Sequence, residues 1–491
     1  MKKLSSLVLS FIMLLTTPLS AHAAGFTSPI GSSISSEAQE HIISQIRRAR
    51  IPNAAIAVIQ DGETSFILQD VSYDTLFNIA SDSKPFTAFG VLLLEDLGLL
   101  SVSDPVNQHL PWFEVNYRDI PVPHEDISIY NLLHHTSGIT SNENRFPRAA
   151  LTETNDEFAS RLRGMELDFY PSTNRIYGNM NYIILGLLIE AVSGQSYDEF
   201  MTQQVLHPLG LYNTFTNEQR AYETGRVVGG HVRTFLQIRP ATRDRNSHPA
   251  NMPTGGIYAS IADMARWAEI QLGIVYVPEQ FARIVQRSRL QHHDLNTPVA
   301  EITNFHAAGW LVDLDAGFIG HGGQATHGYS SMFRMFPQNN TAVIVLSSLR
   351  YQSVDQLGMV ALEALVSGSF NRVGFELFEI IDMFSTILIV VGIAHIALFI
   401  RLAIKVNKRL RSGERIKVNF SLKNIRKFPI ISITGLIFYY TFHFIILDTT
   451  RASIAANWPI SFTVASIAIW IMTLYDLFSW FAKVFIQKDA L

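Results

Sequence analysis

Ser81-Asp82-Ser83-Lys84 stands directly before a stretch, Pro85 to about Leu97, whose composition predicts a helix. Positions i and i+3 of a helix lie on one face, so the side chains of Ser81 and Lys84 are expected to touch. A serine beside a lysine that is shielded from water is a nucleophile with its proton acceptor attached. Alone, the four-residue pattern also fits a solvated helix start. Its meaning therefore depends on the rest of the chain.

Two further motifs follow. Tyr177-Gly178-Asn179 opens an apolar helical run from Tyr182 to Val192. His321-Gly322-Gly323-Gln324 lies between a predicted strand through Phe318 and another beginning near Ser331. A tyrosine can relay a proton to a leaving group, an asparagine can orient a lysine, and glycines let a substrate backbone lie along a strand edge. Each motif alone fits a cap, a turn or a packed aromatic, but together the three predict one active site.

The region from residue 24 to 373 has mixed polarity and is predicted to be α+β. A helix is expected at Ser36–Arg48, followed by two β-branched runs joined across Asp61-Gly62, a strong hairpin signal. Near the other end we expect strands at 309–313, 331–336 and 341–347 and a closing helix at 354–366. The predicted fold is an antiparallel sheet flanked by helices, with a helical lobe from about 85 to 290 inserted between its two halves.

The composition limits the kinds of protein to consider. The chain has 491 residues, 48% hydrophobic and 16% charged, which is too long for one ordinary domain and slightly too apolar for a purely soluble protein. A net charge of -4 is small for this length, so no nucleic-acid partner is expected. The absence of cysteine excludes disulfides, thiolate metal sites and cysteine nucleophiles. We expect neither a metal nor a cofactor.

Both ends of the chain carry membrane-related signals. Lys2 and Lys3, an apolar run from Leu7 to Leu15 and the small residues of Ala21-His22-Ala23 have the layout of a signal peptide, predicted at residues 1–23. That apolar run is too short to span about 30 Å of hydrocarbon. Three later segments each approach the roughly 20 residues that a spanning helix needs. The predicted transmembrane helices are 380–400, 429–447 and 458–481.

The loop between the first two predicted spans, residues 401–427, is strongly basic, with ten Lys or Arg against the single Glu414. The positive-inside rule places this loop in the cytoplasm. Residues 24–373 are then outside the cytoplasmic (inner) membrane of a bacterium, on its periplasmic or extracellular face, in agreement with the signal peptide. Asp382 lies near a segment end and is expected to reach water, and His395 is expected to pack between helices.

In this order, the three motifs resemble those of the serine β-lactamase and penicillin-binding-protein superfamily. The resemblance is to its class C-like group of β-lactamases, D-amino-acid peptidases (peptidase S12 type) and esterases. The signatures SxxK, Y-x-N and [KH]-x-G of that group stand here as SDSK, YGN and HGG. The resemblance extends over about residues 36–367 and includes four neighbouring stretches: 77–80, 132–138, 181–182 and 255–258.

The resemblance implies roles for individual residues. Ser81 would be the acylated nucleophile, Lys84 its base and Tyr177 the general acid and base toward the leaving group. Asn179 would support the lysine or the substrate amide. His134, His135 and Ser137 lie in a further motif of the family and are expected to hold the helical lobe together.

The third motif would form the wall that faces the substrate. His321 and Gly323 would line the strand, and the backbone amides of Ser81 and Gln324 would form the oxyanion hole. His327 follows this motif and is a candidate specificity residue, with a turn-exposed histidine as the alternative.

Two residues depart from the family pattern. Gly178 stands where serine is common, which is expected to change little because that side chain carries no proton. His321 replaces the lysine of typical β-lactamases and weakens the permanent positive charge at neutral pH. We therefore expect peptides or esters, rather than β-lactams, to be the better substrates.

The whole architecture resembles the peptidases of the colibactin-maturation type, which activate nonribosomal peptide prodrugs by removing an N-acyl-D-asparagine cap. This resemblance implies a small peptide-like substrate and the membrane as a partner, with an exporter of the prodrug and a second copy of the chain as further candidates. The alternatives are a D-Ala-D-Ala carboxypeptidase or endopeptidase, an esterase or a β-lactamase of the same superfamily, and a non-catalytic receptor for penicillin-like ligands. The intact Ser81, Lys84 and Tyr177 argue against the receptor.

Overall fold

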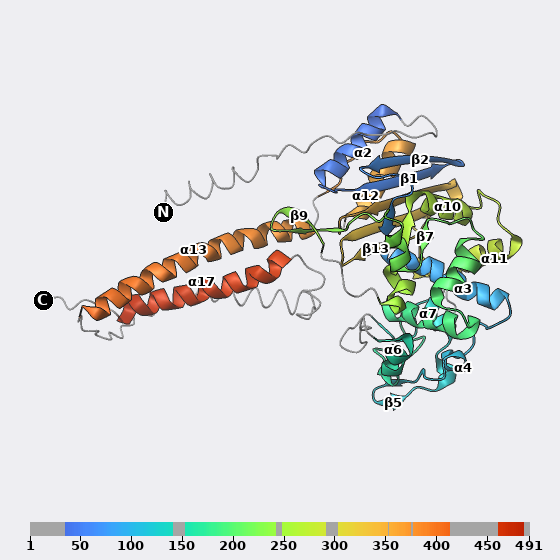
Figure 1. The fold of residues 1–491 in the computed structure, drawn as a ribbon, viewed down its shortest axis with the longest axis horizontal. Helices are drawn as coiled ribbons and strands as arrows, with labels where there is room; N and C mark the ends of the chain where they lie inside the picture. The colour runs from blue at the N-terminus through green and yellow to red at the C-terminus, as the bar shows by residue number, and fades with distance from the viewer. Residues whose placement is uncertain are drawn as a thin grey trace.

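The computed structural model describes residues 35–140, 153–241, 248–290, 303–351, 353–374, 377–412 and 460–485. Residues up to 374 form a sheet with helices on both faces and a helical lobe, and two long helices extend away from this unit (Figure 1). The predicted signal peptide lies outside the described residues, as does the basic loop from residue 413 onward.

A seven-stranded antiparallel sheet forms the centre, in the order β11-β12-β13-β14-β15-β1-β2. Strands β1 and β15 pair along their whole length, from Ala54 opposite Ser347 to Gln60 opposite Thr341. Strands from the beginning and the end of the catalytic unit are therefore neighbours in one sheet, as predicted. The strands are β1 Ala54–Gln60, β2 Glu63–Gln69, β11 Asn304–His306, β12 Leu311–Asp313, β13 Phe318–Ala325, β14 Tyr329–Phe336 and β15 Thr341–Ser347.

The hairpin between β1 and β2 turns at Asp61 and Gly62, with φ of 51° and 83°. Two left-handed residues in succession give the tight turn whose twist matches that of the strands, which is why Asp-Gly was a reliable signal.

The two faces of the sheet are covered by different helices. Helices α2 (Ser36–Arg48) and α12 (Val354–Val366) pack on one face, and α10 (Ile261–Leu272) packs against β1 and β15 on the other. Successive residues of β1 point to opposite faces. Ile56 accordingly joins the core with α2 and α12, while Ala57 joins the larger core on the lobe side.

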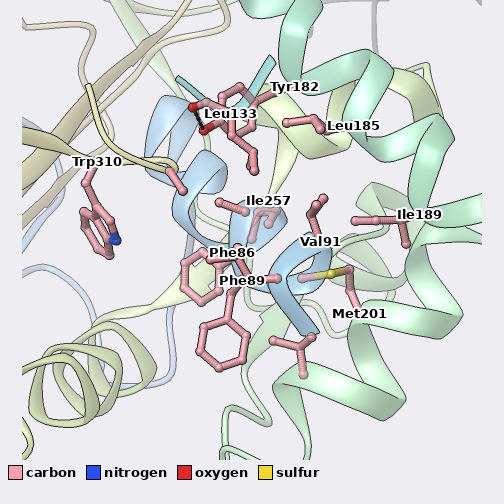
Figure 2. Close-up of a cluster of buried hydrophobic side chains, with 14 of the residues drawn as sticks. Phe86, Phe89, Val91, Leu133, Tyr182, Leu185, Ile189, Met201, Ile257 and Trp310 are labelled. Carbon is pink, nitrogen blue, oxygen red and sulfur yellow. Dashed lines mark hydrogen bonds between the residues drawn. The ribbon is translucent and has the colours of Figure 1, made fainter. Parts of the chain in front are cut away.

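The larger core is built around α3 (Lys84–Asp96). Phe86 is fully buried and stacks on Trp267 of α10 at a ring distance of 4.5 Å. In Figure 2, Val91 of α3 lies beside Ile189 of α7, and the ring of Phe89 lies 5.6 Å from that of Trp267. The other helices of this part are α4 Val106–His109, α5 Ile129–Leu133, α6 Asn155–Leu162, α7 Asn179–Ser193, α8 Tyr197–Phe200, α9 Glu218–Glu223 and α11 Glu279–Arg287.

The remaining short strands form two three-stranded sheets and one two-stranded sheet. They are β3 Leu76–Asn78, β4 Val115–Tyr117, β5 Ile120–Pro121, β6 Met165–Glu166, β7 Thr214–Phe215, β8 His231–Thr234, β9 Gln237–Pro240 and β10 Tyr258–Ser260. Strand β3 pairs with β10 and leads directly into the 3₁₀ turn η1 (Ala80–Ser83).

The two long helices, α13 (Leu377–Arg411) and α17 (Ile460–Phe485), pack side by side and run in the same direction (Figure 1). The ring of His395 lies 5.3 Å from that of Tyr475, and one turn farther along both helices Phe399 lies 4.9 Å from Phe478. His395 therefore packs between helices, as expected.

The three predicted membrane spans are confirmed only in part. In the described part of the chain, one stretch, Asp382–Lys408 of α13, is long and apolar enough to cross a membrane. Helix α17 covers the third predicted segment, and its described residues include a shorter apolar stretch, Ile467–Phe478. The predicted span 429–447 lies outside the described residues.

The expectation that Asp382 reaches water is wrong. Its side chain is fully buried, and its two carboxylate oxygens accept hydrogen bonds from the backbone amides of Phe235 (2.8 Å) and Leu236 (2.6 Å), at the tip of the β8–β9 hairpin. Glu379, one turn earlier, pairs with Arg233 of β8 at 2.9 Å. The start of α13 is therefore fastened to the catalytic unit.

Replacing Asp382 should release this hairpin. Phe235 and Leu236 have φ of 52° and 61°, a left-handed conformation that is unfavourable for residues with a side chain. The hydrogen bonds from their amides to Asp382 offset this cost. Asp382→Asn leaves one amide without an acceptor, a loss of about 1–3 kcal/mol. Tryptic cleavage after Arg233, which is buried in this hairpin, should then be roughly tenfold faster in the full chain, as followed by mass spectrometry. The matched control is Asp315→Asn, in an exposed turn, and equal cleavage of both variants would contradict the contact.

Candidate active site

The nucleophile turn begins at the end of β3. Ala80 has φ of 46°, a left-handed value that is unusual for alanine, and its amide is held by the side chain of Asn78 at 2.9 Å. This turn leads into η1 and presents Ser81, half-buried, where the sheet meets the helical lobe. Helix α3 begins only at Lys84, so Ser81 and Lys84 are related by a 3₁₀ turn, in which positions i and i+3 lie directly above one another.

The side-chain nitrogen of Lys84 has three oxygen neighbours. It lies 3.1 Å from Ser81 Oγ, 2.9 Å from Asn179 Oδ1 and 2.7 Å from the carbonyl oxygen of Thr254. A neutral amine has two N–H donors and one lone pair. Donation to Asn179 and Thr254 leaves the lone pair directed at the Ser81 hydroxyl.

Lys84 is fully buried. Removal from water disfavours its charged form and lowers its pKa well below the usual range, and the neighbouring Asp82 partly opposes this shift. An amine that is neutral near physiological pH can accept a proton. The pairing of Ser81 with Lys84 therefore has the geometry and the electrostatics that nucleophile activation needs.

Tyr177 reaches Ser81 from the helical lobe. Its hydroxyl donates to Ser81 Oγ at 2.9 Å, and Lys84 Nζ lies 4.8 Å from its ring centre. Burial raises the pKa of Tyr177, so the phenol keeps its proton. Ser81 is thus hydrogen-bonded both to a base and to a neutral acid.

The loop that carries Tyr177 is held by a buried histidine. His135 Nδ1 accepts the backbone N–H of Gly178 at 3.2 Å, and its ring lies 4.7 Å from that of Tyr177. Burial lowers the pKa of His135 far below its ordinary value, which keeps the ring neutral and able to accept. Ser137 accepts the amide of Ile139 at 3.1 Å. His134 binds the carbonyl of His306 at 3.1 Å.

Close packing explains why position 178 is a glycine, which the sequence did not reveal. A Cβ at this position would lie 2.4 Å from the carbonyl oxygen of Ile139 and 2.9 Å from Asn181 Nδ2. Two segments of the lobe therefore close on this glycine, and a side chain here would displace the neighbouring Tyr177.

The wall opposite Tyr177 is the edge of β13. Strand β12 pairs with β13 only from Phe318 to Gly320, so the residues beyond Gly320 form an open edge. A Cβ on Gly323 would lie 2.6 Å from the amide nitrogen of Ser81, which explains the glycine. The backbone of Gln324 follows next to this contact, and the Ser81 amide belongs to a first helical turn, where N–H groups lack intrahelical acceptors.

His321 projects from this edge toward Tyr177, at a ring distance of 6.0 Å, and its Nδ1 lies 2.9 Å from the amide nitrogen of Gly322. Burial lowers its pKa to about 3, and the nearby Lys84 acts in the same direction. His321 is therefore neutral near physiological pH, which goes further than the weakened charge predicted from the sequence.

A cavity of about 300 Å³ follows the β13 edge. His306, His321, Gly323 and Gln324 contribute to its lining, together with Arg334, Val354 and Asp355. Ser81, Lys84 and Tyr177 do not line it, so this cavity lies beside the reacting groups and not around them. His327 does not line it either: it lies in the β13–β14 turn with its ring 5.2 Å from that of Tyr329. Its role in specificity stays a prediction.

The structure thus brings together Ser81, Lys84, Tyr177, Asn179, His321, Gly323 and Gln324. Sequence reasoning missed the contributions of Thr254 and His306 and the positioning role of His135. The Thr254 contact is made by a backbone carbonyl and left no sequence signal. His135 was noticed as part of a family motif, but its contact with Gly178 depends on the tertiary fold.

A serine bonded to a buried lysine and a tyrosine, between an antiparallel sheet and a helical lobe, is the arrangement of a serine hydrolase that uses lysine as its base. The Beta-lactamase family model matches residues 38–366, which is more than half of the chain. The chain belongs to the Beta-lactamase family, and within it to the serine hydrolases of the β-lactamase and penicillin-binding-protein type.

The chain is similar to two named bacterial proteins. Protein flp of Staphylococcus aureus (strain MW2) is 27% identical over 457 residues, covering 88% of this chain and 87% of that protein. Penicillin-binding protein 4* of Bacillus subtilis (strain 168) is 32% identical over 175 residues, covering 33% and 37%. The match to flp is longer than residues 38–366, so it includes chain outside the catalytic unit.

Two solved structures share the fold. A class C beta-lactamase superimposes with a TM-score of 0.55 at 16% identity, over 67% of this chain and 97% of that one. The octameric penicillin-binding protein homologue from Pyrococcus abyssi gives 0.56 at 21% identity, over 71% and 80%.

Gly178→Ser should impair acylation without unfolding the protein. The added side chain pushes the loop away from Ile139 and moves the Tyr177 hydroxyl away from Ser81; displacements of about 1 Å can cost up to about a hundredfold in rate. The rate of labelling by a fluorophosphonate and the melting temperature would be measured together. Gly229→Ser is the control, because a Cβ there meets no atom within 4 Å. Equal labelling rates in the two variants would refute this role of Gly178.

Proposed function

We propose that this protein is a membrane-anchored peptidase that cleaves an amide through an acyl-enzyme on Ser81. The observation that carries the proposal is the hydrogen-bonded set in which Ser81 Oγ lies 3.1 Å from Lys84 Nζ and 2.9 Å from the Tyr177 hydroxyl. Nucleophile, base and acid are all in place around one oxygen atom.

In the acylation step, Lys84 takes the proton of Ser81 as Oγ bonds to the carbonyl carbon of the substrate. Tyr177 gives its hydroxyl proton to the leaving nitrogen, and the Lys84 ammonium returns a proton to Tyr177. The amides of Ser81 and Gln324 bind the oxyanion, each contributing about 3 kcal/mol. Water then attacks the ester with the same base, which releases the acid and restores the serine.

The neutral His321 supports a proposal for the substrate class. The depressed pKa of His321 means that this side chain offers hydrogen bonds rather than positive charge to the substrate. A substrate that presents an internal amide is therefore favoured over one that needs a cation for a terminal carboxylate. We infer an N-acyl-D-amino-acid cap of the D-asparagine type, removed from a nonribosomal peptide or polyketide prodrug that an exporter delivers.

The likeness to penicillin-binding protein 4* favours a second candidate, a D-Ala-D-Ala carboxypeptidase or endopeptidase that acts on cell-wall peptides. The same acyl-enzyme chemistry serves both candidates, and they differ in the substrate groups that must be bound beside Ser81.

The described helices also support the membrane placement. Because α13 and α17 run in the same direction, the chain that joins them must return to the side from which α13 starts. The predicted span 429–447 lies in this connection. We propose three spans, with the catalytic unit on the periplasmic or extracellular face of the cytoplasmic membrane.

Loss of the nucleophile should abolish covalent labelling. The full chain in detergent should react with a fluorescent fluorophosphonate or penicillin, and Ser81→Ala should lose this labelling completely, as read by gel fluorescence. Ser160→Ala, at an exposed serine of α6, should keep it. A folded wild-type protein that takes up neither label would instead favour a non-catalytic receptor.

Offering two substrates side by side should separate the candidate peptidases. An N-acyl-D-asparaginyl amide and a muropeptide that ends in D-Ala-D-Ala would be incubated with the wild type and with Ser81→Ala, and products would be quantified by liquid chromatography. We expect at least about tenfold faster turnover of the asparaginyl amide, since loss of one paired polar group costs about 1–3 kcal/mol. Turnover of the muropeptide alone would rule out the prodrug proposal.

A further inference from the structure

The nucleophile turn carries a second ionisable group, Asp82, that the mechanism above does not use. Its side chain is only 2% exposed, and neither carboxyl oxygen has a hydrogen-bond donor within the described residues. Ser331 is near, but its hydroxyl donates to the carbonyl of Ile79 at 2.6 Å. A buried carboxylate without donors is strongly disfavoured unless a cation lies close to it.

The cation closest to Asp82 along the chain is Lys84, two residues farther in the same turn, and both side chains are buried. Three histidines, His135, His306 and His321, also interact electrostatically with Lys84, and they are neutral because burial lowers the pKa of each. Burial raises the pKa of Asp82 to about 7, Asp355 of α12 adds to the shift, and Ser331 and Lys84 oppose it. Part of the charge of Asp355 is offset by Arg334 of β14, at 3.5 Å. Tyr177 also faces this region and stays uncharged, because burial raises its pKa.

Acylation creates an ammonium at the most enclosed point of the site, because Lys84 accepts the serine proton while fully buried. Asn179 and Thr254 offer oxygen dipoles to Lys84 but no negative charge. We propose that Asp82 is a positioning residue that supplies the counter-charge for the Lys84 ammonium and so sets the strength of Lys84 as a base. This inference rests on the proposed function, in which Lys84 is that base.

The sign of the effect follows from electrostatics. A nearby carboxylate favours the protonated amine, so removing it lowers the pKa of Lys84 further. A base of lower pKa deprotonates at lower pH but accepts a proton less readily from the serine. Asp82→Asn should therefore move the acid limb of the kcat profile to lower pH and reduce its plateau. A merely structural role would lower stability and leave the acid limb in place.

Lys84 can be titrated directly, because it is the single lysine between Lys3 and Lys405. The full chain would be produced with lysine isotopically labelled at Cε, and the Lys84 resonance would be assigned by its loss in Lys84→Arg. In Asp82→Asn we expect the titration midpoint to fall by about one pH unit or more and the acylation rate to fall about tenfold. KM should stay unchanged, because Asp82 is buried and does not reach the substrate.

Asp263→Asn is the matched control. Asp263 is a buried acid whose pKa is also raised by burial. Its role is to join α10 to β7, because its carboxylate accepts hydrogen bonds from the Asn213 amide at 2.7 Å and the Thr214 hydroxyl at 2.9 Å. Its replacement should lower the melting temperature and leave the Lys84 titration unchanged.

An identical Lys84 titration in the wild type and in a folded Asp82→Asn would overturn the inference. If Asp82→Asn fails to fold, Asp82→Ser offers a smaller neutral side chain for the same measurement. The titration needs no substrate, so it can succeed or fail independently of the proposed function, which the labelling of Ser81 tests.

Discussion

The burial of one amine governs the arrangement of this protein. Lys84 gains its reactivity because its nitrogen is withdrawn from water and surrounded by oxygen atoms of Ser81, Asn179 and Thr254. These three residues come from the nucleophile turn, the start of α7 and the turn before β10. The sheet and the helical lobe must both be assembled before the lysine is desolvated. The chemistry therefore depends on a tertiary junction and not on a local motif.

Close approach at this junction requires glycine. Gly323 brings the edge of β13 against the Ser81 amide, and Gly309, with φ of 81°, places backbone next to Pro85 and the Lys84 carbonyl. Gly178 lets the Tyr177 loop close on Ile139. The three glycines come from different parts of the chain. Two of them let backbone approach the nucleophile turn and the start of α3, and Gly178 lets the Tyr177 loop approach another segment of the lobe. The resulting rigidity keeps the reacting groups within hydrogen-bonding distance.

The sequence predicted the sheet and the main motifs well, because both depend on short-range patterns. Runs rich in β-branched residues and the Asp-Gly turn located β1, β2 and β15, and helix periodicity located α2 and α12 within a residue or two. It did not predict the contact of Thr254 with Lys84 or that of His135 with Gly178, because each joins residues more than 40 positions apart. Asp382 was misassigned for the same reason: its position suggested water, but its partners lie in a distant hairpin.

The attachment of α13 restricts how the catalytic unit can move. The amide of Val373 is bonded to Gln45 of α2, and Asp382 already holds the β8–β9 hairpin, so few residues separate the last anchored position of the sheet domain from the helix. The same hairpin continues to His231, whose amide contacts Gly328 in the turn after β13. With α13 in a bilayer, the entrance to the cavity would have a fixed height and orientation above the lipid surface. A catalytic unit held in this way could not turn freely about the helix, as it could on a flexible tether.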